Sequence, residues 1–308
     1  MDGVAVRFKG LDLNLLVALD VMLEERSVSG AARRLFLSQS ATSGALARLR
    51  EHFCDDLLIP VGRQMMTTPF AERLIEPLRN LMLQIDATVS PGQAFDPTTS
   101  RRTFRIGCSD YITEVLISCL ISRVAEAAPG VVLDVVAPGD DQTGALEAGE
   151  IDVLVTPTLF LAAGHPHEPL YDEGHVVVAW TENTLLADGR MDAERFRSLG
   201  HVVVRFGRAR ASSMAESWLD AHIPDRRIEL VAPAFMHVPR MIVGTQRIAI
   251  THERLARMQA KLLPIRLFEP PFEMPVLQET IQYHRARQSD GGIRWLAGML
   301  HASVADMI

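Results

Sequence analysis

Arginines and short hydrogen-bonding side chains gather between positions 33 and 48 of this 308-residue chain. Behind them, apolar residues recur at helical spacing, at Ala41, Ala45, Leu46 and Leu49. The other face of this predicted helix carries groups that suit the base edges and phosphates of a DNA major groove. The residues that we assign to this DNA contact are Arg33, Arg34, Ser38, Gln39, Ser40, Thr42, Ser43, Arg48 and Arg63.

Two short helices that meet at a tight turn must position these groups. In the first helix, Ala31 and Ala32 are small enough to let a second helix cross at close range. Phe36 and Leu37 are expected to fill the turn, and Ser38 is a good N-cap for the second helix. The sequence therefore predicts a helix-turn-helix. An ordinary helical hairpin with a solvated polar face is the alternative.

Positive charge is concentrated in the same region. Six arginines and three acidic residues lie between Arg26 and Arg63. The whole chain has 31 Lys and Arg against 38 Asp and Glu, a formal net charge of -7. A local excess of positive charge in an acidic protein favours contact with phosphate.

A long amphipathic helix is predicted to follow, starting at the N-cap Thr68 and Pro69. Its apolar stripe consists of Phe70, Leu74, Leu78, Leu81 and Ile85. We expect this stripe to pair with the same helix of a second subunit, because a connecting helix has little core of its own. Packing on its own chain is the alternative. Pro77 should kink the helix or end its regular part.

Beyond residue 102 the pattern changes to alternating strands and helices. Strands are predicted at 104–108, 131–136, 176–180, 201–206, 228–231, 247–251 and 280–284, with another ending at 156. Helices are predicted at 112–127, 143–148, 213–222, 235–243 and 291–301. This alternation is typical of mostly parallel α/β sheets. It indicates two subdomains, with the last strand and helix returning to the first.

Ligands of open α/β sheets bind outside the carboxyl ends of the strands. The predicted ligand contacts at these ends are Ser109, Tyr111, Thr158, Arg205, Phe206, Phe235, His237 and Thr251. Arg205, a lone cation after an apolar strand, could pair with a phenolate or carboxylate, and a surface salt bridge explains it equally well. Ser109 as a helix cap, His237 as a helix-terminus histidine, and Phe206 and Phe235 as core residues are further alternatives.

Signatures of common enzymes are missing from the sequence. It has no dinucleotide or phosphate-binding glycine loop, no Gly-x-Ser-x-Gly and no His-Glu-x-x-His, so we assign no catalytic residue, metal or cofactor. Cys54, Cys108 and Cys119 form neither a disulfide framework nor a metal motif. No apolar run approaches the roughly 20 residues of a membrane span, and the start lacks a signal peptide pattern. We expect a cytoplasmic protein.

Five motifs resemble, in order and spacing, the N-terminal region of LysR-type transcriptional regulators: LDLNLL (11–16), SGAARRL (29–35), LSQSATS (37–43), LARLR (46–50) and TTPFA (67–71). Residues 7–20, 95–97 and 100–106 resemble more narrowly the branch of rhizobial nodulation regulators and regulators of aromatic-compound degradation. Ser40 stands where the family usually has proline. The segment LLIPVGR (57–63) makes Arg63 the expected phosphate contact of the wing.

The resemblance implies a winged helix-turn-helix, a linker helix, and an α/β effector domain with the two-subdomain fold of periplasmic binding proteins. We place the winged helix-turn-helix at 1–67, the linker and dimerisation helix at 68–90, a hinge at 91–102 and the effector domain at 103–308. Subdomain I takes 103–163 and 270–308, and subdomain II takes 164–269.

The resemblance also implies a function. It predicts a homotetrameric activator, a dimer of dimers, that binds double-stranded promoter DNA and acts through RNA polymerase on genes for aromatic-compound catabolism. An aromatic or phenolic inducer would occupy the effector domain, with no membrane partner. The alternative from another class is an α/β solute-binding or enzymatic protein whose N-terminal helices only mediate assembly. A regulator with a degenerate cleft is a third possibility.

Overall fold

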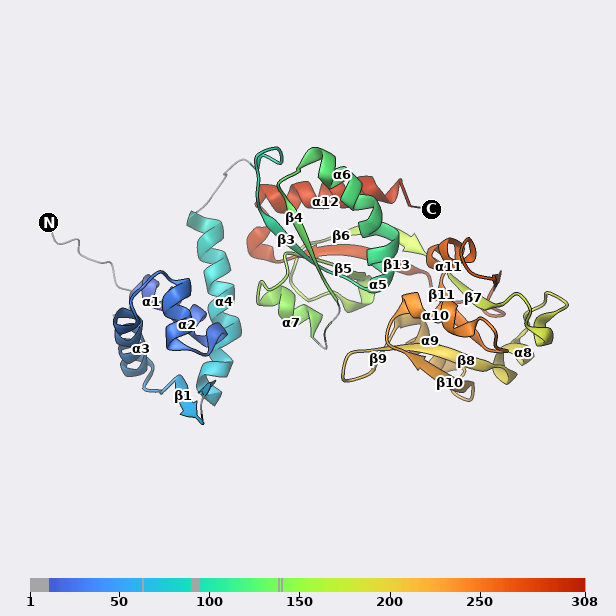
Figure 1. The fold of residues 1–308 in the computed structure, drawn as a ribbon, viewed down its shortest axis with the longest axis horizontal. Helices are drawn as coiled ribbons and strands as arrows, with labels where there is room; N and C mark the ends of the chain where they lie inside the picture. Colours follow the sequence, from blue (N-terminus) through green and yellow to red (C-terminus); the bar gives the residue numbers. More distant parts are fainter. Residues whose placement is uncertain (1–10, 63, 90–94, 138, 140, 308) are drawn as a thin grey trace. The chain divides into compact units, whose positions relative to one another are not determined.

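The computed structural model describes residues 11–62, 64–89, 95–137, 139 and 141–307. Arg63 and the first part of the predicted hinge, 91–94, lie outside the described residues. The chain divides into two compact units, one of residues 1–90 with 147–149 and one of residues 91–146 with 150–308 (Figure 1).

The N-terminal unit has the predicted winged helix-turn-helix. Its elements are α1 (Leu13–Glu25), α2 (Val28–Arg34), α3 (Gln39–Phe53), β1 (Leu58–Val61), β2 (Gln64–Thr67) and α4 (Pro69–Val89). Ser27 caps α2 and Ser38 caps α3, each accepting a hydrogen bond from the backbone N–H three residues on. The wing strands β1 and β2 pair antiparallel.

The turn between α2 and α3 differs from the prediction that Phe36 and Leu37 fill it. Phe36 is 97% exposed and Leu37 is 48% exposed. Phe36 has a left-handed backbone with φ of 55°, which turns its side chain away from the two helices. The helices pack directly on each other instead, through the buried Ala31 and Leu46.

The first half of α4 packs on its own unit, which was the alternative to a pairing role. Leu78 is buried in the core formed with α1, and Phe70 and Leu74 pack partly buried against that core. Leu81 is 41% exposed, so the apolar stripe emerges from the unit only there. Pro77 lies inside α4 without ending it. Its position is exposed, where water can satisfy the carbonyl that loses its helical partner.

The C-terminal unit contains two sheets. The first has the order β4-β3-β5-β13-β6 and is built from β3 (Thr103–Gly107), β4 (Val132–Val136), β5 (Val153–Pro157), β6 (His167–Glu173) and β13 (Leu277–Tyr283). The second has the order β10-β8-β11-β7-β12 and is built from β7 (His175–Trp180), β8 (Gly200–Phe206), β10 (Arg227–Ala232), β11 (Ile248–His252) and β12 (Ile265–Phe268). Short β9 (Ala211–Ser212) pairs with β8.

The helices follow the strands as the alternation predicted. They are α5 (Asp110–Ile112), α6 (Ser118–Ala127), α7 (Gln142–Glu147), α8 (Ala193–Ser198), α9 (Met214–His222), α10 (Val238–Ile242), α11 (Glu253–Ala260) and α12 (Gly291–Val304). A π-helical stretch, Thr113–Ile117, joins α5 to α6. Helices α6 and α12 lie side by side on the first sheet (Figure 1).

The sheets are mixed rather than mostly parallel. β3 runs parallel to β4 and β5, but β13 runs antiparallel to β5 and β6. The chain passes to the second sheet at Gly174, so β6 belongs to the first sheet and not to a second subdomain starting at residue 164. Pro166 and Pro169 obscured this strand in the sequence. An edge strand such as β6 tolerates proline because one side of its backbone has no partner strand.

A hydrophobic cluster continues from one sheet to the other. It includes Ile106 on β3, Val178 on β7 and Val204 on β8, all nearly fully buried. A separate cluster around Phe196 and Leu219 covers the other side of the second sheet. The continuous core fixes the carboxyl ends of several strands relative to one another.

We expect Leu78→Ala to lower the free energy of unfolding of the N-terminal unit by about 2–5 kcal/mol, because it leaves a cavity against α1. Leu13→Ala is the matched control, since Leu13 is 45% exposed on α1 and its truncation should cost under about 0.5 kcal/mol. Hydrogen exchange of the α1 and α3 amides measures both changes. Equal effects of the two substitutions would contradict the placement of Leu78 in this core.

Candidate DNA interface and binding pocket

One face of α3 presents the polar groups that the sequence assigns to DNA. Gln39, Ser40, Ser43 and Arg48 are all exposed along this helix. The opposite face is buried in the core of the unit. Ser38 has a structural task as well, because its Oγ accepts the Ala41 N–H at 3.1 Å. The first turn of α3 is thereby held with its exposed side chains facing outward.

Three of the nine predicted DNA contacts lie differently from expectation or outside the described residues. Thr42 is fully buried and donates its hydroxyl hydrogen to the Ser38 carbonyl, because position 42 continues the apolar stripe of α3. Arg34 is bonded to acidic residues of α1, with Nη1 2.8 Å from Glu24 and 3.2 Å from Glu25. Arg63 lies outside the described residues. Arg33 is exposed, as predicted.

Arg50 is a residue of this interface that sequence reasoning missed. Its Nε donates to the Asp56 carbonyl at 2.8 Å and its Nη2 to the Leu58 carbonyl at 2.6 Å. These bonds join the end of α3 to the start of the wing. Asp55 adds a second connection by accepting the Thr68 hydroxyl at 2.6 Å. Arg50 therefore positions the wing relative to α3.

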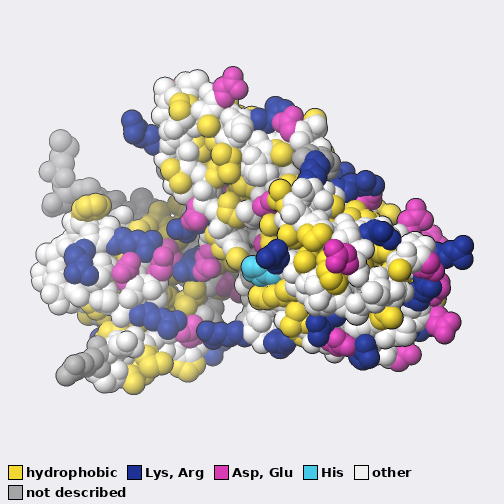
Figure 2. Space-filling view, turned by 45° about the vertical axis from the view of Figure 1, so that its right-hand side comes forward, with side chains coloured by type: hydrophobic (Ala, Val, Ile, Leu, Met, Phe, Trp, Pro, Cys, Tyr) yellow, Lys and Arg dark blue, Asp and Glu magenta, His cyan; other side chains and the backbone are white. Residues whose placement is uncertain are grey.

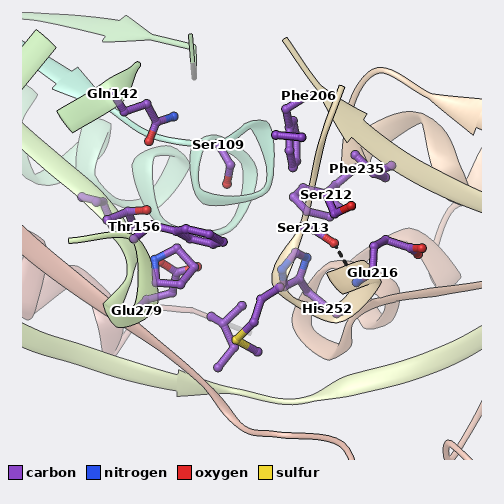
Figure 3. A pocket seen from close by; sticks show the side chains of 18 of the residues that line it. Ser109, Gln142, Thr156, Phe206, Ser212, Ser213, Glu216, Phe235, His252 and Glu279 are labelled. Atoms are coloured by element: carbon purple, nitrogen blue, oxygen red, sulfur yellow. Dashed lines mark hydrogen bonds between the residues drawn. The ribbon is translucent and has the colours of Figure 1, made fainter. Parts of the chain in front are cut away.

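The C-terminal unit contains a pocket at the strand ends, with a volume of about 440 Å³. Ser109, Thr156 and Glu279 reach it from the first sheet, and Phe206 and His252 from the second (Figure 3). Ser212 of β9, Ser213 and Glu216 at the start of α9, and Phe235 in the 3-10 turn before α10 are also labelled around it (Figure 3). The pocket thus lies where the two subdomains face each other, as the strand-end rule predicted.

Four predicted ligand contacts line this pocket, namely Ser109, Phe206, Phe235 and Thr251. Ser109 combines this position with the predicted capping role, since its Oγ accepts the Ile112 N–H at 3.2 Å. Phe206 and Phe235 pack edge to face at 5.1 Å between ring centroids and form an aromatic wall. The hydroxyl of the buried Thr251 has no hydrogen-bond partner among the described residues.

Tyr111 and Thr158 do not line the pocket. Tyr111 is fully buried, and its hydroxyl group bonds to Glu173 and accepts a hydrogen bond from the Tyr171 hydroxyl at 3.0 Å. Thr158 is exposed, with its Oγ1 at 2.8 Å from the Thr280 hydroxyl. Tyr111 instead supports the pocket from behind, because its ring stacks on His252 at 3.8 Å.

Arg205 and His237 are also outside the pocket lining. The Arg205 guanidinium bonds to Ser212 and to Asp220, the latter at 2.9 Å, which is the salt-bridge alternative. His237 is exposed at the start of α10. The prediction that these two residues are anion partners in the pocket is therefore wrong for this structure. Neither side chain is among the residues that line the cavity.

Three titratable side chains that sequence reasoning did not assign line the pocket floor, namely His175, His252 and Glu279. Both ring nitrogens of His175, Nδ1 of His252 and Oε2 of Glu279 are buried without a hydrogen-bond partner among the described residues. Buried polar atoms normally have partners. A ligand that enters the pocket could supply them.

Burial shifts the titration of all three groups. It lowers the pKa of His175 to about 4 and holds the pKa of His252 well below the usual histidine range. Burial, followed by the charge of Glu173, raises the pKa of Glu279 to about 8. At neutral pH the floor therefore consists of two uncharged imidazoles and an un-ionised carboxyl group.

The sequence contained a signal for these residues. His252 ends the apolar run of β11, His175 precedes three valines of β7, and Glu279 interrupts β13. A titratable residue within a buried strand is costly unless it has a partner or a function, so it indicates a site.

Among the described residues no group of His, Cys, Asp and Glu is arranged to hold a metal ion. No helix in the described part of the chain is long and apolar enough to cross a membrane.

Known proteins resemble the chain over almost its whole length. It is 40% identical to nodulation protein D 2 of Rhizobium tropici over 98% of this chain and 96% of the relative. It is 41% identical to nodulation protein D 3 of Rhizobium meliloti over 96% of this chain and 94% of the relative.

Solved structures show the same fold. A probable transcriptional regulator of Pseudomonas aeruginosa matches with a TM-score of 0.65 and 27% identity over 96% of this chain and 97% of that one. Full-length LysG of Corynebacterium glutamicum with bound effector arginine matches with a TM-score of 0.63 and 18% identity over 97% and 99% of the two chains. The second likeness concerns the fold alone.

Two family matches cover the two units. Residues 13–72 match the family described as bacterial regulatory helix-turn-helix protein, lysR family, and residues 98–305 match the LysR substrate binding domain. The predicted fold and the predicted resemblance are both confirmed. The chain belongs to the LysR family of transcriptional regulators.

Proposed function

We propose that this regulator binds promoter DNA through the exposed face of α3 and activates transcription when a small aromatic, phenolic molecule occupies the pocket of its effector domain. The observation that carries the proposal is the pocket itself. An aromatic wall of Phe206 and Phe235 stands near a floor of buried polar atoms that lack partners among the described residues. Small-molecule sites commonly combine apolar walls with a few polar groups in this way.

Regulation is favoured over the solute-binding or enzymatic alternative by the family, whose members are transcriptional regulators. The exposed polar side chains of α3 support DNA contact rather than an assembly role. The similarity to nodulation proteins fits the predicted branch of nodulation regulators and regulators of aromatic-compound degradation. That branch resemblance is the support for activation and for an aromatic inducer. We place the protein in the cytoplasm, where promoter DNA is found.

The effector must favour one arrangement of the protein over another, because equal affinity for both would shift nothing. The pocket lies between two subdomains. An effector that contacts both can therefore change the relative populations of two arrangements of these subdomains. In an oligomer, such a change would alter the spacing of the DNA-binding units and hence the bend or register of the promoter. We propose a dimer of dimers that contacts RNA polymerase.

Gln39→Ala should reduce specific retardation of the promoter fragment upstream of the neighbouring operon, because a good base contact contributes about 1–3 kcal/mol of discrimination. Weaker, salt-sensitive binding should persist. The matched control is Gln84→Ala, which removes an exposed glutamine from α4. Specific binding that survives Gln39→Ala unchanged in a competition mobility-shift assay would remove α3 from base recognition.

Leu81→Asp should shift the full-length protein toward monomers, because a carboxylate in an apolar pairing surface costs several kcal/mol. Leu81 is the residue to change rather than Leu78, because Leu78 belongs to the core of its own unit. Sedimentation velocity at micromolar concentration measures the change. Leu13→Asp is the control on α1, and an unchanged assembly in Leu81→Asp would move the interface away from this part of α4.

A matching phenolic effector should raise the melting temperature of the protein. At a hundredfold excess over its dissociation constant, a ligand stabilises the folded state by about 2.7 kcal/mol. A thermal-shift screen of phenols, chlorophenols, salicylates and flavonoids measures this effect, and Phe206→Ala should abolish it. Stabilisation by a sugar, an amino acid or an aliphatic acid alone would contradict the aromatic inducer.

A further inference from the structure

The pocket contains acidic residues and lacks basic ones. Among its described lining residues are Asp141, Glu216 and Glu279, and no lysine or arginine. On the face drawn in Figure 2, by contrast, blue Lys and Arg side chains and magenta Asp and Glu side chains are interspersed. A ligand that enters this pocket therefore meets no cation in the described lining.

The arginines that lie behind the pocket wall are bonded to other residues. Arg226 is buried, with Nη2 at 2.6 Å from Glu216 and at 2.7 Å from Asp220. Arg205 bonds to Asp220 and Ser212. These contacts compensate the guanidinium charges before any ligand arrives. A ligand carboxylate would lose its hydration without gaining an ion pair, which is costly in a protein interior.

Glu279 has one oxygen that is available to a ligand. The side chain is 2% exposed, and Oε2 has no hydrogen-bond partner among the described residues. The Arg254 guanidinium donates a hydrogen bond to the nearby Glu173 at 2.9 Å, so its carboxylate partner is Glu173. Burial and the charge of Glu173 raise the pKa of Glu279 to about 8. At neutral pH its carboxyl group carries a hydrogen and can donate it.

The two histidines complete a floor without net charge. Their rings are 5.5 Å apart between centroids, and burial keeps both uncharged at neutral pH. A neutral imidazole has one donor and one acceptor nitrogen. Other titratable or charged groups of the elements around Glu279 are Glu173 and Tyr171 on β6, Cys108 after β3, Tyr111 on α5 and Arg254 on α11.

We propose that Glu279, together with His175 and His252, makes the pocket select an uncharged ligand with carbonyl or hydroxyl oxygens and reject the carboxylate of the same size. Glu279 donates its hydrogen to a ligand oxygen, and the imidazoles supply a further donor and acceptors. The selection is a matter of charge and is separate from the shape of the aromatic wall. It rests on the proposed role of the pocket as the effector site.

The first test needs no ligand. It compares the melting temperature of the effector-domain transition between pH 5 and pH 9 for the full-length protein, Glu279→Gln and the control Glu182→Gln, which changes an exposed glutamate. A raised pKa means that the folded state holds a proton that the unfolded chain releases near its ordinary value of 4.5. The contribution of Glu279 to stability should therefore fall as the pH rises from there to about 8 and then level off.

Glu279→Gln should remove that part of the pH dependence, because the amide mimics the un-ionised acid and does not titrate. Glu182→Gln should leave it in place. Equal pH profiles for the unchanged protein and Glu279→Gln would overturn the proposal that Glu279 is un-ionised at neutral pH.

The second test measures ligand charge directly with two matched pairs. Isothermal calorimetry at pH 6.5 compares 2-acetylnaphthalene with 2-naphthoate, and cyclohexyl methyl ketone with cyclohexanecarboxylate. In at least one pair we expect the ketone to bind more than tenfold more tightly. Its affinity should fall as the pH passes about 8 in the unchanged protein. It should stay constant in Glu279→Gln.

Two outcomes of the calorimetry overturn the inference: equal or tighter binding of the carboxylate, or no binding of either ketone. If only the aliphatic ketone binds and its carboxylate does not, the charge selection is supported while the aromatic effector of the proposed function fails. Selective binding of the naphthyl ketone supports both.

Discussion

The buried carboxylate of Glu173 is the group on which the effector domain depends. It ends β6, where the chain leaves the first sheet for the second, and it is 1% exposed. Tyr111 of α5 and Arg254 of α11 both bond to it, so elements beside both sheets meet at one charge. The backbone N–H groups of Gly174 and Arg254 add two further hydrogen bonds. Because an unpaired buried carboxylate is strongly unfavourable, this cluster holds the crossing point together.

The same cluster influences the protonation of Glu279 and the position of the His252 ring in the pocket floor. The charge of Glu173 contributes to keeping Glu279 un-ionised, and Tyr111 supports the ring of His252 by stacking. A ligand that bonds to His252 and Glu279 would therefore contact groups that are packed directly against the crossing between the sheets. Under the proposed function, an effector bound to these groups can favour one arrangement of the subdomains. Its contacts lie where the two sheets meet, so their strength depends on that arrangement.

The sequence predicted the DNA-binding unit well because local signals agree there. Ser38 caps α3, and its apolar stripe fixes which face is buried. Single side chains were less predictable. Thr42 reads as polar but continues the buried stripe, and Phe36 reads as core but takes a left-handed backbone that exposes it. Leu78 belongs to a stripe whose first half contacts α1, and periodicity alone cannot say which surface a helix covers.

The sequence by itself determined the family, most of the helices and strands in their order, and the strand ends at which a pocket forms, because capping, periodicity and alternation are properties of neighbouring residues. Tertiary structure decided which side chains meet in the pocket. Arg205 turns to Asp220, whereas Glu279 and His252 come together from β13 and β11, far apart in the chain. The pKa of Glu279 depends on burial and on Glu173, and both exist only when the sheets are packed. The distances between residues that are far apart in the sequence, such as Glu173 and Glu279, set the charge of the site, and local sequence does not contain them.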